Sequence, residues 1–222
     1  MTRGILVAGN ESALCRAIEA ETLKRVEQFA AAFLPNRLSE TIKNPEPDNE
    51  KRLSIEWNPS SPISARALVL AAENRLEHID EAILVCSPPS FRCSPSMLPF
   101  SAVEIMNNDY VKGWFFLVKE LTDVFKSRSR GTLALVYPDI NSSSGKDEAA
   151  DILGSPALAS FRALTSGLLA AAHNESYLTV GFSTSDSGHE SAFASYIFKS
   201  IDELTKRSNG KLFKFGKFSF FK

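Results

Sequence analysis

Glycine and cysteine are both scarce in this chain. Glycine accounts for 11 of 222 residues, about 5% against an ordinary usage of about 7%. The three cysteines, Cys15, Cys86 and Cys93, cannot form a complete set of disulfides and lack the spacing of a zinc site. We therefore expect buried, reduced thiols, no bound metal and a cytoplasmic protein.

The chain also lacks an excess of either charge and any long apolar run. The 25 basic and 26 acidic residues leave a net charge of −1, which argues against a nucleic-acid partner. No run approaches the roughly 18 apolar residues of a membrane span, and the apolar start at residues 5–8 is too short for a signal sequence. What the chain has is 44% hydrophobic residues with 16 phenylalanines, enough for the core of one domain over residues 1–222.

Short apolar runs alternate with segments of helical periodicity from end to end. Strands are predicted at residues 5–8, 29–34, 53–57, 82–86, 132–137, 178–182 and 211–221. Helices are predicted at residues 12–26, 59–78, 101–129, 155–174 and 191–207. This alternation predicts an α/β fold: a single Rossmann-like, doubly wound domain with a mostly parallel seven-stranded sheet and helices on both faces.

Several segments, taken in order, resemble the short-chain dehydrogenase/reductase family. Residues 5–18, ILVAGNESALCRAI, parallel that family's first strand, its T-G-x-x-x-G-x-G turn and the start of its first helix. Residues 79–85, IDEAILV, resemble its fourth strand, and residues 110–115, YVKGWF, resemble its N-x-x-G-x-F stretch. Residues 131–136 and 209–213 resemble its fifth and last strands. The resemblance spans nearly the whole chain and implies a Rossmann oxidoreductase fold.

The cofactor motifs of that family are incomplete here. Its first turn uses glycines so that backbone N–H groups can approach a diphosphate. Only Gly9 matches, because Ala13 and Cys15 occupy the other two positions and Glu11 adds a negative charge. In the loop after the fourth strand, the family's N-N-A-G is replaced by CSPP at residues 86–89. We therefore expect no cofactor.

NADP or NAD is the alternative, and four residues would then contribute to the site. The resemblance assigns Gly9 to the phosphate turn, Arg37 to a 2′-phosphate and Asn58 to the adenine. Ser12 is the fourth candidate, although a serine before a helix is also an ordinary N-cap.

The resemblance also identifies the positions of the family's proton-transfer group. That group uses a Tyr as general acid, a Lys four residues later, a Ser after the fifth strand and an Asn in the long helix. Phe161 occupies the Tyr position, Thr165 the Lys position and Tyr110 the Asn position. Because Phe161 has no proton to give, we predict a non-catalytic structural or regulatory subunit. The alternative is an NAD(P)-dependent short-chain oxidoreductase or a dinucleotide-binding sensor with a remodelled site.

Two regions predict self-association as a homodimer or homotetramer. Ala159, Ala163, Gly167 and Ala171 form a stripe of small residues that suits helix–helix contact, and the resemblance pairs the helices near residues 101–129 and 155–174 across a dimer interface. Packing of this stripe on the sheet is the competing interpretation. The phenylalanine-rich strand at residues 211–221 is expected at an interface as well.

Overall fold

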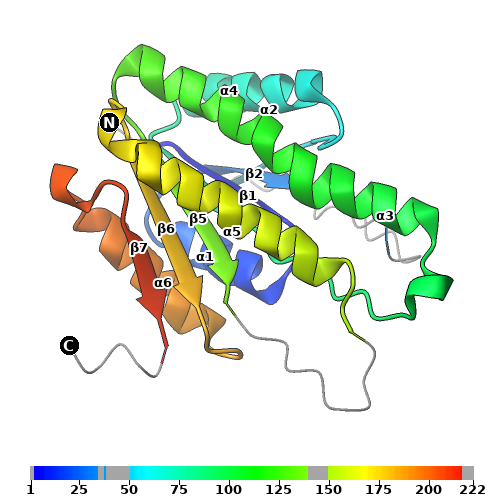
Figure 1. Cartoon of the computed structure of the whole chain (residues 1–222). Coiled ribbons are helices and arrows are strands. Elements are labelled where there is room, and N and C mark those ends of the chain that lie inside the picture. The colour runs from blue at the N-terminus through cyan, green and yellow to red at the C-terminus, as the bar shows by residue number, and fades with distance from the viewer. Residues whose placement is uncertain (1–2, 35–37, 39–50, 140–149, 217–222) are drawn as a thin grey trace.

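A single parallel sheet organises the computed structural model, which describes residues 3–34, 38, 51–139 and 150–216. Seven strands of the described residues lie in this sheet in the order β3-β2-β1-β4-β5-β6-β7, and every pairing is parallel. Figure 1 shows β7 at one edge, next to β6. The strands are β1 (Ile5–Gly9), β2 (Phe29–Phe33), β3 (Arg52–Ile55), β4 (Glu81–Val85), β5 (Thr132–Pro138), β6 (Leu178–Thr184) and β7 (Leu212–Phe215). The predicted α/β class, with its doubly wound seven-stranded sheet, is confirmed.

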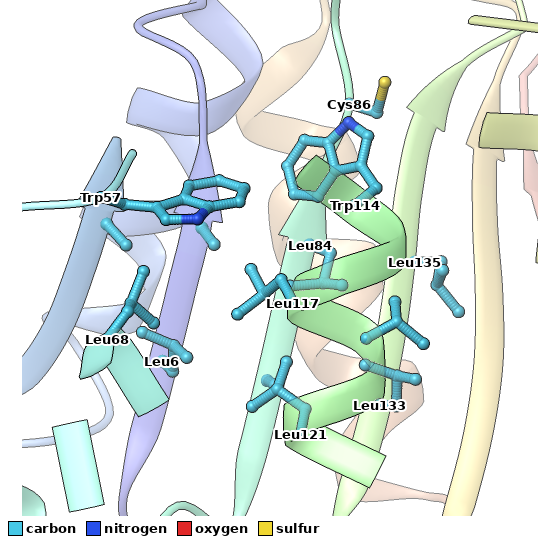
Figure 2. Close-up of a cluster of buried hydrophobic side chains, with 14 of the residues drawn as sticks. Leu6, Trp57, Leu68, Leu84, Cys86, Trp114, Leu117, Leu121, Leu133 and Leu135 are labelled. Atoms are coloured by element: carbon cyan, nitrogen blue, oxygen red, sulfur yellow. The ribbon is translucent and has the colours of Figure 1, made fainter. Parts of the chain in front are cut away.

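Helices cover both faces of the sheet, as the apolar strands require. They are α1 (Ala13–Thr22), α2 (Pro62–Leu76), α3 (Phe100–Asn107), α4 (Gly113–Arg128), α5 (Gly154–Ala171) and α6 (Glu190–Asp202). The core on one face is built with α2, α4 and α5, and the core on the other face with α1 and α6. Figure 2 shows the first core, where Leu117 and Leu121 of α4 pack beside leucines of β4 and β5. None of the helices in the described ranges has the length and hydropathy that a membrane crossing needs.

The helix predicted over residues 101–129 is interrupted. A π-helical segment, Asn108–Lys112, separates α3 from α4. At Gly113, the first residue of α4, an added Cβ would come within 2.5 Å of the Pro59 side chain. Periodicity alone does not reveal this change, because the apolar positions continue through it. A π-helical turn often marks a functional site.

The last strand is shorter than predicted. Regular pairing with β6 covers Leu212–Phe215, and residues 217–222 of the predicted strand lie outside the described residues. Phe213 stacks on Phe182 at 5.2 Å between ring centroids, and Phe215 stacks on Phe193 at 5.4 Å. Two of the five phenylalanines of this C-terminal segment are thus packed within the chain itself.

Candidate functional site

The two halves of the sheet diverge between β1 and β4, which are neighbours in space but far apart in sequence. Connections leave β1 and β4 toward opposite sides, and in such folds ligands bind outside the carboxyl ends of the strands at this point. Gly9, the last residue of β1, pairs in register with Val85, the last residue of β4. The candidate site therefore begins at the turns that follow these two residues.

The turn after β1 leads directly into α1. Ser12 is the N-cap of α1, and its hydroxyl accepts a hydrogen bond from the backbone N–H of Cys15. The first turn of an α-helix leaves other N–H groups without an intrahelical partner, and Ala13 at this end is exposed. The role of Ser12 as a cap agrees with the structure, while its role toward a cofactor stays a prediction.

Gly9 is needed for close approach of α1 to the sheet. A Cβ added at Gly9 would lie 2.9 Å from the Cys15 sulfur and 3.0 Å from the Val85 carbonyl oxygen. The Cys15 side chain is buried in the core between α1 and the sheet, and burial raises the pKa of its thiol. The Cys15 thiol therefore fills the space that the missing side chain of Gly9 leaves. The start of α1 is exposed, and a helix N-terminus of this kind favours an anion, whereas the nearby carboxylate of Glu11 disfavours one.

A hydrogen bond connects the turn after β1 to the loop after β4. The side-chain amide Nδ2 of Asn10 donates to the backbone oxygen of Ser87 at 2.7 Å. The Oδ1 atom of Asn10 is buried and has no hydrogen-bond partner among the described residues. Sequence reasoning missed this contact, because nothing in either segment specifies the distant partner.

The loop after β4 is held at its far end by Asp151. One carboxylate oxygen of Asp151 accepts from the backbone N–H groups of Phe91 and Gly154, both at 2.9 Å. A Cβ on Gly154 would lie 2.5 Å from the backbone oxygen of Pro89, so this glycine permits close contact at the start of α5. Asp151 thus joins the loop that follows β4 to the helix that carries Phe161.

Aromatic side chains occupy the region between α4, α5 and the ends of the strands. Trp114 lies between Trp57, at 5.5 Å between ring centroids, and Phe161, at 5.3 Å. The Phe161 ring in turn contacts Tyr137 of β5 at 6.2 Å. All four side chains are buried, and Phe161 is only 1% exposed. Figure 2 shows Trp114 directly beside Cys86, which follows β4.

The other two residues at the family's proton-transfer positions are buried as well. Thr165 follows Phe161 by one turn of α5, is 1% exposed, and donates its hydroxyl hydrogen to the Phe161 carbonyl oxygen. Tyr110 lies in the π-helical segment and is also buried. Burial raises the pKa of the Tyr110 hydroxyl well above its ordinary value. Neither side chain supplies the cation that would make a neighbouring phenol more acidic.

Two further positions were assigned to a cofactor, Asn58 and Arg37. Asn58 is exposed after β3, where its Oδ1 accepts hydrogen bonds from the backbone N–H and the hydroxyl of Ser60. Arg37 lies outside the described residues. The structure therefore brings Gly9 and Ser12 together and leaves Asn58 on the rim of the sheet.

A polar group at the ends of β5 and β6 was not singled out from the sequence. Arg162 pairs with Asp139 at 2.7 Å, and its guanidinium lies 5.7 Å from the centroid of the Tyr137 ring. Tyr137 and Ser183 are register partners in neighbouring strands. Burial is the main cause that raises the pKa of the Tyr137 hydroxyl, so this phenol is a weak proton donor.

Taken together, the strand order, the helix arrangement and the switch point define the short-chain dehydrogenase/reductase fold. Similar solved structures include the NADH-dependent reductase A1-R′ complexed with NAD, with 10% identity, a TM-score of 0.74, and coverage of 96% of this chain and 95% of that chain. They also include serine dehydrogenase from Escherichia coli, with 12% identity, a TM-score of 0.71, and 96% of each chain covered. A short chain dehydrogenase from Bacillus anthracis str. 'Ames Ancestor' has 11% identity, a TM-score of 0.73, and coverage of 96% and 94%.

The resemblance seen in the sequence is thus confirmed at the level of the fold. No protein-family model and no curated protein matches the chain. The expectation of no cofactor is contradicted, since the similar reductase A1-R′ was solved with NAD and NADH dependence is part of its description. That expectation rested on the two lost glycines, on Glu11 and on residues 86–89, and of these the Cys15 thiol is buried in the core against Gly9.

Proposed function

We propose that this protein binds a nicotinamide dinucleotide across the carboxyl ends of β1 and β4 and acts as a sensor or regulatory subunit. The fold, the NAD-bound reductase among its structural relatives and the exposed start of α1 beside Gly9 support dinucleotide binding. Ser12 and the first turn of α1 would hold the diphosphate. The cofactor, when bound, supplies a hydride donor or acceptor.

The aromatic cluster of Trp57, Trp114, Tyr137 and Phe161 is the observation that supports a non-catalytic role. Carbonyl reduction needs a proton at the substrate oxygen in addition to a hydride. Phe161 has no acidic hydrogen, and its ring is packed between Trp114 and Tyr137. Thr165 gives its hydroxyl hydrogen to the backbone. The residues at these positions therefore stabilise the core and leave proton transfer without a donor.

The second candidate is an NAD(P)-dependent oxidoreductase that draws its proton from another group. Its support comes from the structural relatives, whose descriptions include a NADH-dependent reductase and a serine dehydrogenase. Tyr137 is the member of the aromatic cluster that carries a hydroxyl, but the raised pKa of this hydroxyl disfavours proton donation.

Titration and turnover together distinguish the two candidates. We expect NAD+, NADH, NADP+ or NADPH to bind in isothermal titration calorimetry. We also expect no oxidation of NADH or NADPH, followed at the nicotinamide absorbance, with a panel of aldehydes and ketones. Turnover above the rate without protein would establish the oxidoreductase, whereas failure of all four dinucleotides to bind would overturn the proposed site.

We further propose a homodimer, or a homotetramer built from it, through α4 and α5. Ala159, Ala163 and Gly167 are exposed, so the interpretation that this stripe packs on the sheet is wrong. A Cβ added at Gly167 would meet nothing within 4 Å, and Phe115 of α4 is 49% exposed. These small and apolar surfaces suit close packing against a second copy. The phenylalanine-rich C-terminal strand remains a proposed second contact, while nucleic acid and membranes are not among the partners we propose.

The oligomeric state is measurable by sedimentation velocity. We expect the wild-type chain to sediment as a dimer or tetramer and Ala163→Glu to shift it toward monomer, because the new charge would be buried at the interface. Ala67→Glu places the same charge on the exposed face of α2 and should leave the assembly intact. A monomeric wild-type chain would contradict the proposal.

The proposed compartment is the cytoplasm. The support comes from Cys15, Cys86 and Cys93, which are free thiols in the structure.

A further inference from the structure

Four serines of the chain are each followed by a proline: Ser61, Ser87, Ser94 and Ser155. A proline at the next position has no backbone N–H, and it favours an extended backbone at the serine before it. A serine followed by proline in an exposed segment is what proline-directed protein kinases recognise. The structure distinguishes the four serines by the backbone and the contacts around each.

Three of these serines are held by a helix or by the end of the sheet. Ser61 is the N-cap of α2, and its hydroxyl accepts a hydrogen bond from the Ser64 backbone N–H. Ser155 lies in the first turn of α5, where the backbone is helical. Ser87 is half-buried two residues beyond the end of β4, and its backbone oxygen accepts a hydrogen bond from Asn10. A kinase would have to open the chain locally before it bound any of these three in an extended form.

Ser94 differs from the other three serines in both backbone and exposure. It lies outside the α-helices and strands, and its backbone angles, φ −66° and ψ 141°, are those of an extended polyproline II segment. Ser94, Pro95 and Ser96 are all exposed. The Ser94 hydroxyl oxygen lies 3.0 Å from that of Ser96, a contact between two exposed side chains. The hydroxyl of Ser94 and the proline that follows it are therefore both accessible in the folded chain.

We propose that Ser94 is a phosphorylation site, modified by a kinase that requires proline after the acceptor serine, and that the phosphate then pairs with Arg92. In this reaction the Ser94 hydroxyl oxygen attacks the γ-phosphorus of ATP. The bond from this phosphorus to the β,γ-bridging oxygen breaks, ADP leaves, and the hydroxyl proton passes to a base of the kinase. The modification is independent of dinucleotide binding.

Arg92 lies where it can receive the phosphate. It forms an isolated β-bridge with Asp151, so the backbone is extended and anchored two residues before Ser94. Alternate residues of an extended segment point to the same side. The Arg92 side chain is exposed, and its Nε donates to the Ser90 hydroxyl at 3.3 Å. A phosphate carries a charge of about −1.5 to −2 at pH 7, and a nearby guanidinium forms charge-assisted hydrogen bonds with it.

Phosphorylation of the full chain by a purified mitogen-activated protein kinase with Mg²⁺ and ATP tests the site. Tandem mass spectrometry gives the initial rate at each of the four serines, and each rate is divided by the rate in a peptide with the same flanking residues. This ratio separates the effect of the fold from the sequence preference of the kinase. We expect the ratio at Ser94 to exceed each of the others by about tenfold or more, because the other three serines need local opening first.

Two variants provide the matched comparison. Ser94→Ala should remove most of the phosphate that the folded chain takes up, whereas Ser87→Ala should leave this amount unchanged. Comparable ratios at the four serines, or no phosphate at Ser94 in the full chain, would overturn the site.

The pairing with Arg92 has a measurement of its own. The second pKa of the phosphate on Ser94, followed by phosphorus nuclear magnetic resonance, should lie below its ordinary value of about 6, because a guanidinium favours the dianion. Arg92→Ala should raise this pKa back toward the ordinary value, while Arg66→Ala, on the exposed face of α2, should not change it. The same pKa with and without the Arg92 side chain would overturn the pairing.

Discussion

The two halves of the candidate site differ in what fills them. At the ends of β1 and β4, the turn keeps Gly9, an exposed helix start and a polar side chain at Asn10. Beside the ends of β4 and β5, the buried rings of Trp114, Phe161 and Tyr137 pack against one another, and Phe161 is the residue that the resemblance aligns with the family's general acid. Dinucleotide binding and proton transfer depend on different elements of this fold, so a chain can lose one and keep the other.

The largest loss of stability is expected when the lysine of the family's pattern is introduced among the buried residues of α5. Thr165→Lys would place an ammonium group at a position that is 1% exposed. We expect a loss of roughly 3–5 kcal/mol in the free energy of unfolding, because a buried charge without a partner is strongly destabilising. Urea denaturation measures this loss, and Ser166→Lys, at the next and exposed position of α5, is the control with little expected change.

The stability of Thr165→Lys should depend on pH, and the direction of this dependence follows from the pKa of the new lysine. Burial would lower the pKa of the new Lys in the folded chain below the value of about 10.4 that it has when unfolded. The unfolded chain then binds more protons, so stability rises with pH and the deficit of Thr165→Lys should shrink between pH 7 and pH 10. A deficit that stays constant over this range would mean that the lysine reaches solvent, and that this half of the site is more open than the structure shows.

A smaller effect is expected at the exposed start of α1, where we propose that the diphosphate binds. Ala13→Glu adds a negative charge at the exposed start of α1, which opposes a diphosphate but favours the helix dipole. We expect a loss of about tenfold in dinucleotide affinity, measured by calorimetry, with stability unchanged or slightly increased. Ala67→Glu on α2 carries the same charge change and should bind normally. Equal affinity in both variants would place the diphosphate away from α1.

The sequence predicted the sheet well because its signals are local. Continuous apolar runs such as those of β1 and β4 occur only where both faces of a strand are covered, and the helical stripes between them indicate the crossovers. The interruption between α3 and α4 was missed, since the apolar spacing persists through Asn108–Lys112. The sequence also shows that Phe161 and Thr165 cannot exchange a proton at pH 7, because this property depends on the residue type alone.

The scarcity of glycine was given too broad a meaning. The sequence shows that Ala13 and Cys15 replace two glycines, but it does not show where their side chains point. The structure directs Cys15 into the core against Gly9 and leaves Ala13 at the surface. Whether these two side chains occupy space above the turn therefore depends on where they point, and this depends on how α1 packs on the sheet.

The sequence by itself determined the alternation of strands and helices, the absence of the usual proton donor and the small-residue stripe of α5. Only the tertiary structure decided that this stripe faces outward, that four aromatic rings meet between α4 and α5, and that Asn10 holds the backbone of Ser87. The physical reason is that periodicity and residue chemistry are properties of neighbouring positions. Contacts between segments up to 77 residues apart depend on the fold that brings them together.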